Sequence, residues 1–107
     1  MRKFIHVYIP TAKLHLMRQA LIGVAGTFGG YTIRPAVGSW VDPLTKEHKT
    51  EPIRICSVAV KVSVKGNPDP KDVQTLRRLL VDPLLKWHHE NVVFVVGHDG
   101  IIREYAK

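Results

Sequence analysis

The sequence predicts an α+β fold, in which an antiparallel sheet carries two helices on one face. Two observations lead to this prediction. Apolar residues alternate with polar ones in some segments and recur at helical spacing in others, and these segments follow the order strand, helix, strand, strand, helix, strand. A chain of 107 residues is long enough for one apolar core and too short for two. We therefore expect a single domain over residues 1–107.

The first two predicted elements are a strand over residues 4–9 and a helix over residues 14–28. Even-numbered positions of the strand carry Phe, His and Tyr on one face, and odd-numbered positions carry β-branched residues on the other. Pro10 ends the strand, and Thr11 is a credible N-cap for the helix. The helix is expected from its apolar stripe and from the glycines that end it: Leu14, Met17, Leu21, Val24 and Phe28, then Gly26, Gly29 and Gly30.

Two strands are predicted in the middle of the chain. The second strand, residues 31–37, is expected at an edge of the sheet because Pro35 cannot donate a ladder hydrogen bond. A polar loop through Asp42 leads to the third strand, residues 53–64, which has the clearest alternation in the sequence. The side of this strand that we expect under the helices carries Cys56, Val58, Val60, Val62 and Val64.

The second helix is expected to begin with Asp69 as N-cap and Pro70 at the first helical position. Pro83 lies within the apolar stripe of this helix, so we expect it to kink or split the helix. The last strand of the predicted order covers residues 91–96, and a tail over residues 101–105 follows a glycine turn.

This order is that of the ferredoxin-like, or split βαβ, fold, whose first and third strands are central and whose second and fourth are edges. Strand 91–96 is apolar on both faces, yet the fold would leave it at an exposed edge, which proteins normally cover. We expect self-association over this edge and over the open face of the sheet. The alternative is that the tail covers the strand within one chain.

Composition and charge exclude several classes of function. No run of about 18 apolar residues occurs, so no membrane partner is expected. The net charge of +7 raises the question of nucleic acid, but the basic residues are spread singly or in pairs such as Arg77-Arg78. Nucleic acid is therefore not expected as a partner. Cys56 is the only cysteine, so no internal disulfide can form and a cytoplasmic location is expected.

No motif for a metal, a cofactor or a covalent intermediate stands out. The six histidines lack zinc-ligand spacing, and Cys56 is expected to be a buried, inert thiol. Trp40 and Glu51 remain as the distinctive pair. An indole can stack on a flat ring or face a cation, so the pair suits a small ligand with a positive centre. The alternative is that Trp40 packs over a sheet edge and Glu51 is a solvated loop acid.

The segment "GSWVD…KTEPIRICSVAV" resembles the phage-encoded S-adenosylmethionine lyases, formerly described as hydrolases. The shared features are a glycine-aromatic hairpin at residues 38–40, a Thr-Glu pair at residues 50–51 before a basic-apolar strand, a late Trp87 and an apolar last strand. They follow the same order over most of the chain. Trp40 stands where the family has a tyrosine.

The resemblance implies a ferredoxin-like trimer, similar in assembly to the PII signalling proteins, with active sites between subunits and no cofactor. It implies cleavage of S-adenosylmethionine to methylthioadenosine and homoserine lactone, by attack of the substrate's own carboxylate, in the cytoplasm of an infected bacterial host. Glu51 would hold the ammonium or sulfonium end of the substrate, and Trp40 would contact the sulfonium or the adenine. Backbone amides near Gly38 and Ser39 would meet the carboxylate or the adenine edge.

Tyr8 and Tyr31 are weaker candidates for the wall of this pocket. Two other functions remain open. A non-catalytic PII-like or anti-defence module would use the same aromatic residue and acid to bind a small ligand or a host protein without forming a product. A nucleic-acid binder would stack bases on Phe4 and Tyr8, but the third strand lacks the sequence pattern of RNA-recognition folds.

Overall fold

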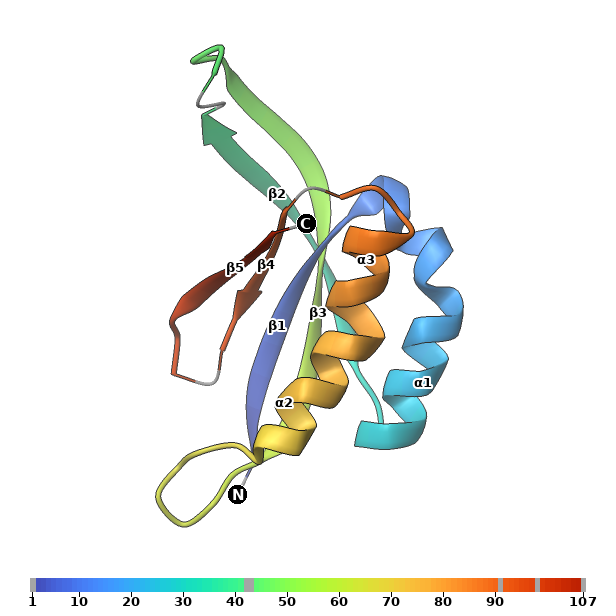
Figure 1. The fold of residues 1–107 in the computed structure, drawn as a ribbon, viewed down its shortest axis with the longest axis vertical. Coiled ribbons are helices and arrows are strands. Elements are labelled where there is room, and N and C mark those ends of the chain that lie inside the picture. The colour runs from blue at the N-terminus through green and yellow to red at the C-terminus, as the bar shows by residue number, and fades with distance from the viewer. Residues whose placement is uncertain (1, 42–43, 91, 98, 107) are drawn as a thin grey trace.

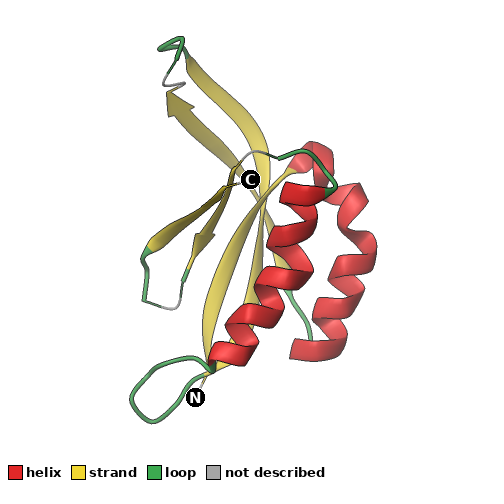
Figure 2. Ribbon diagram, viewed as in Figure 1, coloured by secondary structure: helices red, strands yellow, loops and turns green. Residues whose placement is uncertain are grey.

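An antiparallel sheet with the strand order β2-β3-β1-β4-β5 forms one layer of the protein. The computed structural model describes residues 2–41, 44–90, 92–97 and 99–106. The helical segments lie along one side of the sheet (Figures 1 and 2). This arrangement confirms the α+β class and the ferredoxin-like order of elements. The strands are β1 (Arg2–Pro10), β2 (Thr32–Val41), β3 (His48–Lys61), β4 (Val92–Val96) and β5 (Ile102–Ala106).

The helical layer consists of two rods. The first joins a 3-10 segment, η1 (Thr11–Met17), to α1 (Arg18–Phe28), and the second joins α2 (Pro70–Leu76), a π-helical turn η2 (Arg77–Val81) and α3 (Asp82–Lys86). As predicted, the side chain of Asp69 caps α2 by accepting a hydrogen bond from the backbone N–H of Lys71.

Pro83 interrupts the second rod, as expected, and the interruption is a π turn. A proline inside an α-helix lacks one hydrogen-bond donor and its ring crowds the carbonyl four residues earlier. In the wider turn the backbone N–H of Asp82 bonds to the carbonyl of Arg77, five residues back. The chain therefore passes Pro83 without breaking the rod.

The predicted N-cap at Thr11 is wrong. The 3-10 segment begins directly after Pro10 and has no side-chain capping hydrogen bond, and the Thr11 hydroxyl is buried with no partner among the described residues. At the other end Gly29 closes α1 in the left-handed conformation, with φ of 88°, and its N–H bonds to the carbonyl of Ala25 at 3.0 Å. Gly26 lies within α1 and does not end it.

The bounds of β2 and β3 differ from the prediction. Both strands extend further toward the loop that joins them, and β3 ends earlier at its other end. Beyond the pair of Pro10 with Ile53, β2 and β3 pair only with each other and leave the sheet as a two-stranded ribbon, seen at the top of Figure 1. Asp42, at the tip of this ribbon in the sequence, lies outside the described residues. β3 ends at Lys61, so Val64, expected under the helices, is fully exposed.

The expectation that β4 lies at an exposed edge is wrong. β5 pairs with it over its whole length, from Val92 opposite Ala106 to Val96 opposite Ile102. The alternative, that the tail covers this strand within one chain, is the one observed. β2 is an edge strand, as Pro35 predicted.

The core lies between the sheet and the two rods. Its members alternate along the strands, as predicted for β1 and for the middle of β3, and recur at helical spacing in the rods. The fully buried large side chains are Val7, Ile9, Met17, Val24, Val58, Val60, Leu80, Val81, Leu84 and Val93.

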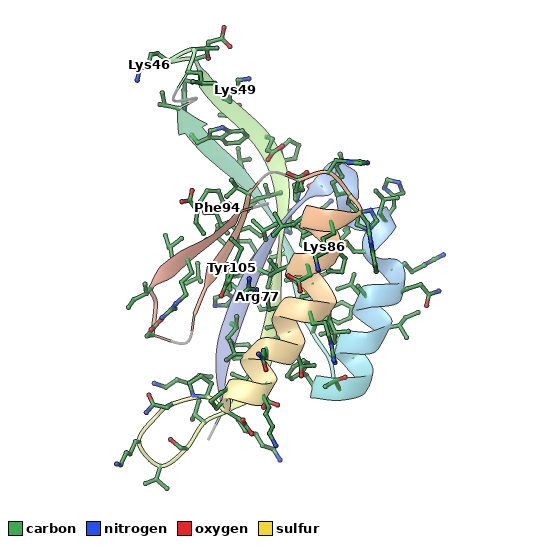
Figure 3. The ribbon with its side chains drawn as sticks, in the orientation of Figure 1. Lys46, Lys49, Arg77, Lys86, Phe94 and Tyr105 are labelled. Atoms are coloured by element: carbon green, nitrogen blue, oxygen red, sulfur yellow. The ribbon has the colours of Figure 1, made fainter. Side chains whose placement is uncertain are left out.

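A cation–π contact joins β5 to the second rod. The guanidinium carbon of Arg77 lies 4.6 Å from the centre of the Tyr105 ring, and Figure 3 shows the two side chains side by side. The Nε atom of Arg77 lies 3.8 Å from a carboxylate oxygen of Asp82, so the guanidinium is held from the rod as well. Tyr105 also packs against the edge of the core.

We expect the variant Tyr105→Leu to lose about 1 kcal/mol of unfolding free energy, because leucine keeps an apolar contact with the core but cannot attract a cation. Urea denaturation followed by circular dichroism measures this loss. Tyr31→Leu is the matched control, since Tyr31 is exposed and has no cation–π contact in the described structure. Equal losses in both variants would contradict a stabilising role for the contact.

Candidate functional site

The candidate site lies where the β2–β3 ribbon leaves the sheet. Glu51 stands opposite Gly38, and Trp40 stands opposite Lys49. Cross-strand partners share a face, and residues two apart on a strand share it too. All four residues therefore lie on one face of the ribbon, which continues the face of the sheet without helices. Trp40 is 42% exposed, and Glu51 is half-buried.

Gly38 allows a close approach at this point. A Cβ atom at Gly38 would meet Cγ2 of Ile53 at 3.3 Å, which is tighter than ordinary van der Waals contact. Ile53 is only 7% exposed, although it lies on the face without helices. The missing side chain of Gly38 thus leaves room for Ile53, which forms an apolar floor beside Glu51.

The environment of Glu51 raises its pKa. Partial burial is the larger cause and the nearby carboxylate of Glu90 is the second, because both disfavour the ionised form. Glu51 and Glu90 thus concentrate negative charge at one point of a chain whose net charge is +7.

Glu90 is held in place by the end of the second rod. His89 adopts a left-handed conformation with φ of 61°, and the N–H of Glu90 then bonds to the carbonyl of Leu84 at 3.0 Å. This hydrogen bond reaches six residues back and closes the end of the rod around the left-handed His89. The ammonium of Lys13 donates to the carbonyl of His88 at 2.7 Å and ties the segment to η1. Sequence reasoning missed Glu90, because an acid after a helix end follows no period.

Three of the predicted site residues come together in one chain: Gly38, Trp40 and Glu51. Tyr8 shares their face but stands opposite Ile55, about 13 Å along β3 from Glu51 at the usual rise of a strand.

Ser39 and Tyr31 lie elsewhere in a single chain. Ser39 faces the other side of the ribbon, where its hydroxyl is hydrogen-bonded to Nε2 of His48 at 2.5 Å. Tyr31 precedes the opposite end of β2, about 30 Å from Trp40 along the strand. Only a neighbouring copy could bring either side chain to Glu51.

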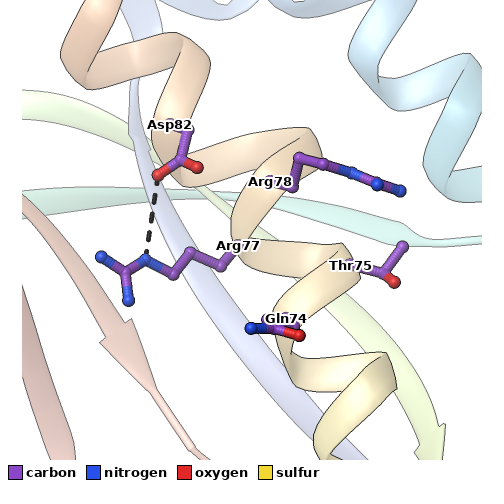
Figure 4. A pocket seen from close by; sticks show the side chains of 5 residues that line it. All are labelled: Gln74, Thr75, Arg77, Arg78 and Asp82. Atoms are coloured by element: carbon purple, nitrogen blue, oxygen red, sulfur yellow. Dashed lines mark ion pairs between the residues drawn. The ribbon is translucent and has the colours of Figure 1, made fainter.

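A surface cavity on the second rod is separate from the candidate site. It measures about 330 Å³ and is lined by Gln74, Thr75, Arg77, Arg78 and Asp82 (Figure 4). All five side chains come from the second rod, so no other element forms a facing wall. Arg77 already has Asp82 and Tyr105 as partners.

The described residues contain few groups suited to other chemistry. Among them, no three His, Cys, Asp or Glu side chains are gathered closely enough to hold a metal ion. Cys56 is buried, as predicted, and burial raises the pKa of its thiol to about 11. In the described parts of the chain, no helix has the length and apolar character needed to span a membrane.

The fold is shared with two known structures. No protein-family model matches the sequence, and no curated protein matches it either. A phage SAM lyase in complex with S-methyl-5'-thioadenosine superposes with a TM-score of 0.68 at 10% identity, over 99% of this chain and 90% of that one. The B. subtilis GlnK–ATP complex superposes with a TM-score of 0.53 at 14% identity, over 99% and 82%. At these identities the likeness is one of fold.

The raised pKa of Glu51 has a consequence for stability. The folded state binds the proton more tightly than the unfolded state does, so the stability that the protonated form gives is lost as the pH rises through the folded pKa. We therefore expect Glu51→Gln to unfold at a higher urea concentration than the wild type at pH 7. At pH 3, where the carboxyl is protonated in both states, the two proteins should unfold together.

Glu47→Gln is the control for this comparison, because Glu47 is an exposed acid in the loop between the two strands of the ribbon. A gain in Glu51→Gln that persists at pH 3 would show that the effect does not come from the charge.

Proposed function

We propose that this protein is an S-adenosylmethionine lyase that forms methylthioadenosine and homoserine lactone at sites between copies of the chain. One observation carries the proposal: Glu51, with Glu90 close to it, lies on the face of the ribbon that carries Trp40. Two acids and an indole suit a ligand with sulfonium and ammonium groups. The fold likeness to a phage SAM lyase that holds S-methyl-5'-thioadenosine, one of the products proposed here, supports this choice of ligand.

Glu51 and Trp40 are expected to contribute different interaction energies with the cation. Opposite unit charges about 4 Å apart attract by about 4 kcal/mol at the effective dielectric of a partly exposed site. A cation–π contact contributes about 0.5–2 kcal/mol. Glu51 is therefore the main anchor for the positive end of the substrate, and Trp40 makes the smaller contribution.

The reaction needs no nucleophile from the protein. A carboxylate oxygen of the substrate attacks the carbon next to the sulfonium, the carbon–sulfur bond breaks, and its electron pair stays on sulfur. The products are a neutral thioether and a five-membered lactone, and no proton is transferred. The protein has to hold the carboxylate in line with that carbon and keep water away. The inert Cys56 agrees with this simple requirement.

A second copy of the chain would complete the site. In one chain Trp40 is 42% exposed, so the ligand would have a wall on one side only. We propose a homotrimer in which a neighbouring copy supplies the other wall, with Ser39, Tyr8 or Tyr31 reaching the ligand across the seam. The protein would act in the cytoplasm of an infected bacterial host.

We expect Glu51→Gln to lower kcat/KM for S-adenosylmethionine at least a hundredfold, because the main anchor for the cation is lost. Trp40→Phe should cost about tenfold, since phenylalanine keeps a weaker cation–π contact. Labelled S-adenosylmethionine and chromatography of the products measure both. Glu47→Gln, in the loop of the same ribbon, should keep wild-type activity.

Full turnover by Glu51→Gln would remove this residue from the mechanism. If the wild type forms no methylthioadenosine at high enzyme concentration, the lyase proposal fails.

The second candidate is a binding module without catalysis, which the likeness to the GlnK–ATP complex favours. It would use the same acid and indole to retain a small ligand. Isothermal titration calorimetry would then show stoichiometric binding of S-adenosylmethionine or a nucleotide, while chromatography finds the ligand unchanged.

A further inference from the structure

The face of the sheet without helices is only partly apolar. The registers of the five strands place apolar and charged side chains together on it. Phe4, Phe94 and Ile102 are exposed there. Arg34 lies toward the β2 edge of the face, and Glu104 lies on β5 at the opposite edge.

These opposite charges indicate which partner the face accepts. If two copies face each other about an axis parallel to the strands, β2 of one lies over β5 of the other, and Arg34 and Glu104 at these edges are then complementary in charge. Covering them would also remove the exposed aromatic side chains from water. A second copy is therefore the occupant that the described residues favour.

His6 lies at the centre of this face. It is on β1, the middle strand, with Ser57 opposite it on β3 and Val96 opposite it on β4. Its Nδ1 atom is hydrogen-bonded to the hydroxyl of Ser57 at 2.6 Å, and Ser57 is only 6% exposed. The ring stacks on Phe4, with centres 6.3 Å apart.

We propose that His6 is a pH gate on self-association, so that copies join through this face when His6 is neutral and separate when it is protonated. The inference rests on the assembly that the proposed function requires. It adds a means of regulating that assembly.

The surroundings of His6 favour its neutral form. A neutral ring shares one hydrogen bond with Ser57 and can be covered by apolar side chains at little cost. An imidazolium would be desolvated and would lie near the like charge of Arg34, and these two effects already lower the pKa of His6 in the single chain, with desolvation the larger. A covering copy would remove more water from the ring and lower the pKa further.

Other elements around His6 offer no direct counter-charge among the described residues. β3 presents Ser57 and β4 presents Val96 as its cross-strand neighbours. β2 presents the base Arg34, and Tyr8 follows on the same face of β1. The acid Glu104 lies two strands away on β5. An imidazolium in a covered face would thus have no acidic partner from its own sheet in contact with it.

The sign of the effect follows from linkage. The associated state has the lower pKa and binds fewer protons, so association is strongest above the pKa that His6 has in the single folded chain, which itself lies below the ordinary value of about 6.5. It weakens as the pH falls through the pKa of the single chain and is weakest below the still lower pKa of the associated state. Each unit of difference in pKa weakens association about tenfold for each histidine.

Sedimentation velocity at pH 8 and pH 5 tests the gate on the wild type, on His6→Gln and on His15→Gln. Glutamine can keep a hydrogen bond to Ser57 but cannot become charged, and His15 is an exposed residue of η1. We expect the wild type and His15→Gln to associate at pH 8 and to weaken at least tenfold at pH 5. His6→Gln should associate alike at both values. Circular dichroism at both values checks that each protein stays folded.

Equal association of the wild type at both pH values, the same weakening in His6→Gln, or a monomeric wild type at pH 8 would each overturn the inference. Should His6→Gln fail to fold, histidine NMR of the wild type gives the pKa of His6 in the oligomer, and a value at or above 6.5 would overturn the gate. Product analysis at pH 8 tests the lyase separately, because a pH-sensitive oligomer that forms no methylthioadenosine would sink only the proposed function.

Discussion

The end of β1 at Pro10 is the constraint on which the candidate site depends. Up to the pair of Pro10 with Ile53, β3 has β1 on one side and β2 on the other. Beyond that pair the first helical rod begins, because proline ends the strand and the chain turns away. β2 and β3 then continue as a ribbon without a third strand, which leaves Glu51 at the border between sheet and ribbon.

The helical rods meet this border from the other side. The left-handed turn at His89 ends the second rod and sets Glu90 near Glu51, while Lys13 of the first rod holds the same segment through the carbonyl of His88. Glu90 thereby adds to the partial burial that raises the pKa of Glu51.

The face of the sheet without helices combines exposed aromatic side chains with charged and polar ones. Its exposed aromatic side chains favour burial against a partner. Arg34, Glu104 and the His6–Ser57 pair require that this partner has matching polar groups. A face that is mixed in this way gives specificity to association, since a partner without complementary charges would leave buried groups unpaired. The β5 strand covers the apolar edge that β4 would otherwise expose, so copies cannot associate over the edge of β4.

The sequence by itself determined the class of fold and most of its elements. Period-two and helical spacing, Pro35 in an edge strand, the Asp69 cap and the interruption at Pro83 all report local chemistry, which a short window of sequence contains. It also predicted that Gly38, Trp40 and Glu51 lie near one another, because neighbours across a hairpin are close in sequence. Glu90, the covering strand β5, the buried Thr11 hydroxyl and the His6–Ser57 pair were decided only by the tertiary structure. Each of these depends on a contact between segments that are distant in the chain, either across the sheet or at the end of a rod. A local pattern of apolar residues does not determine which distant segments come into contact.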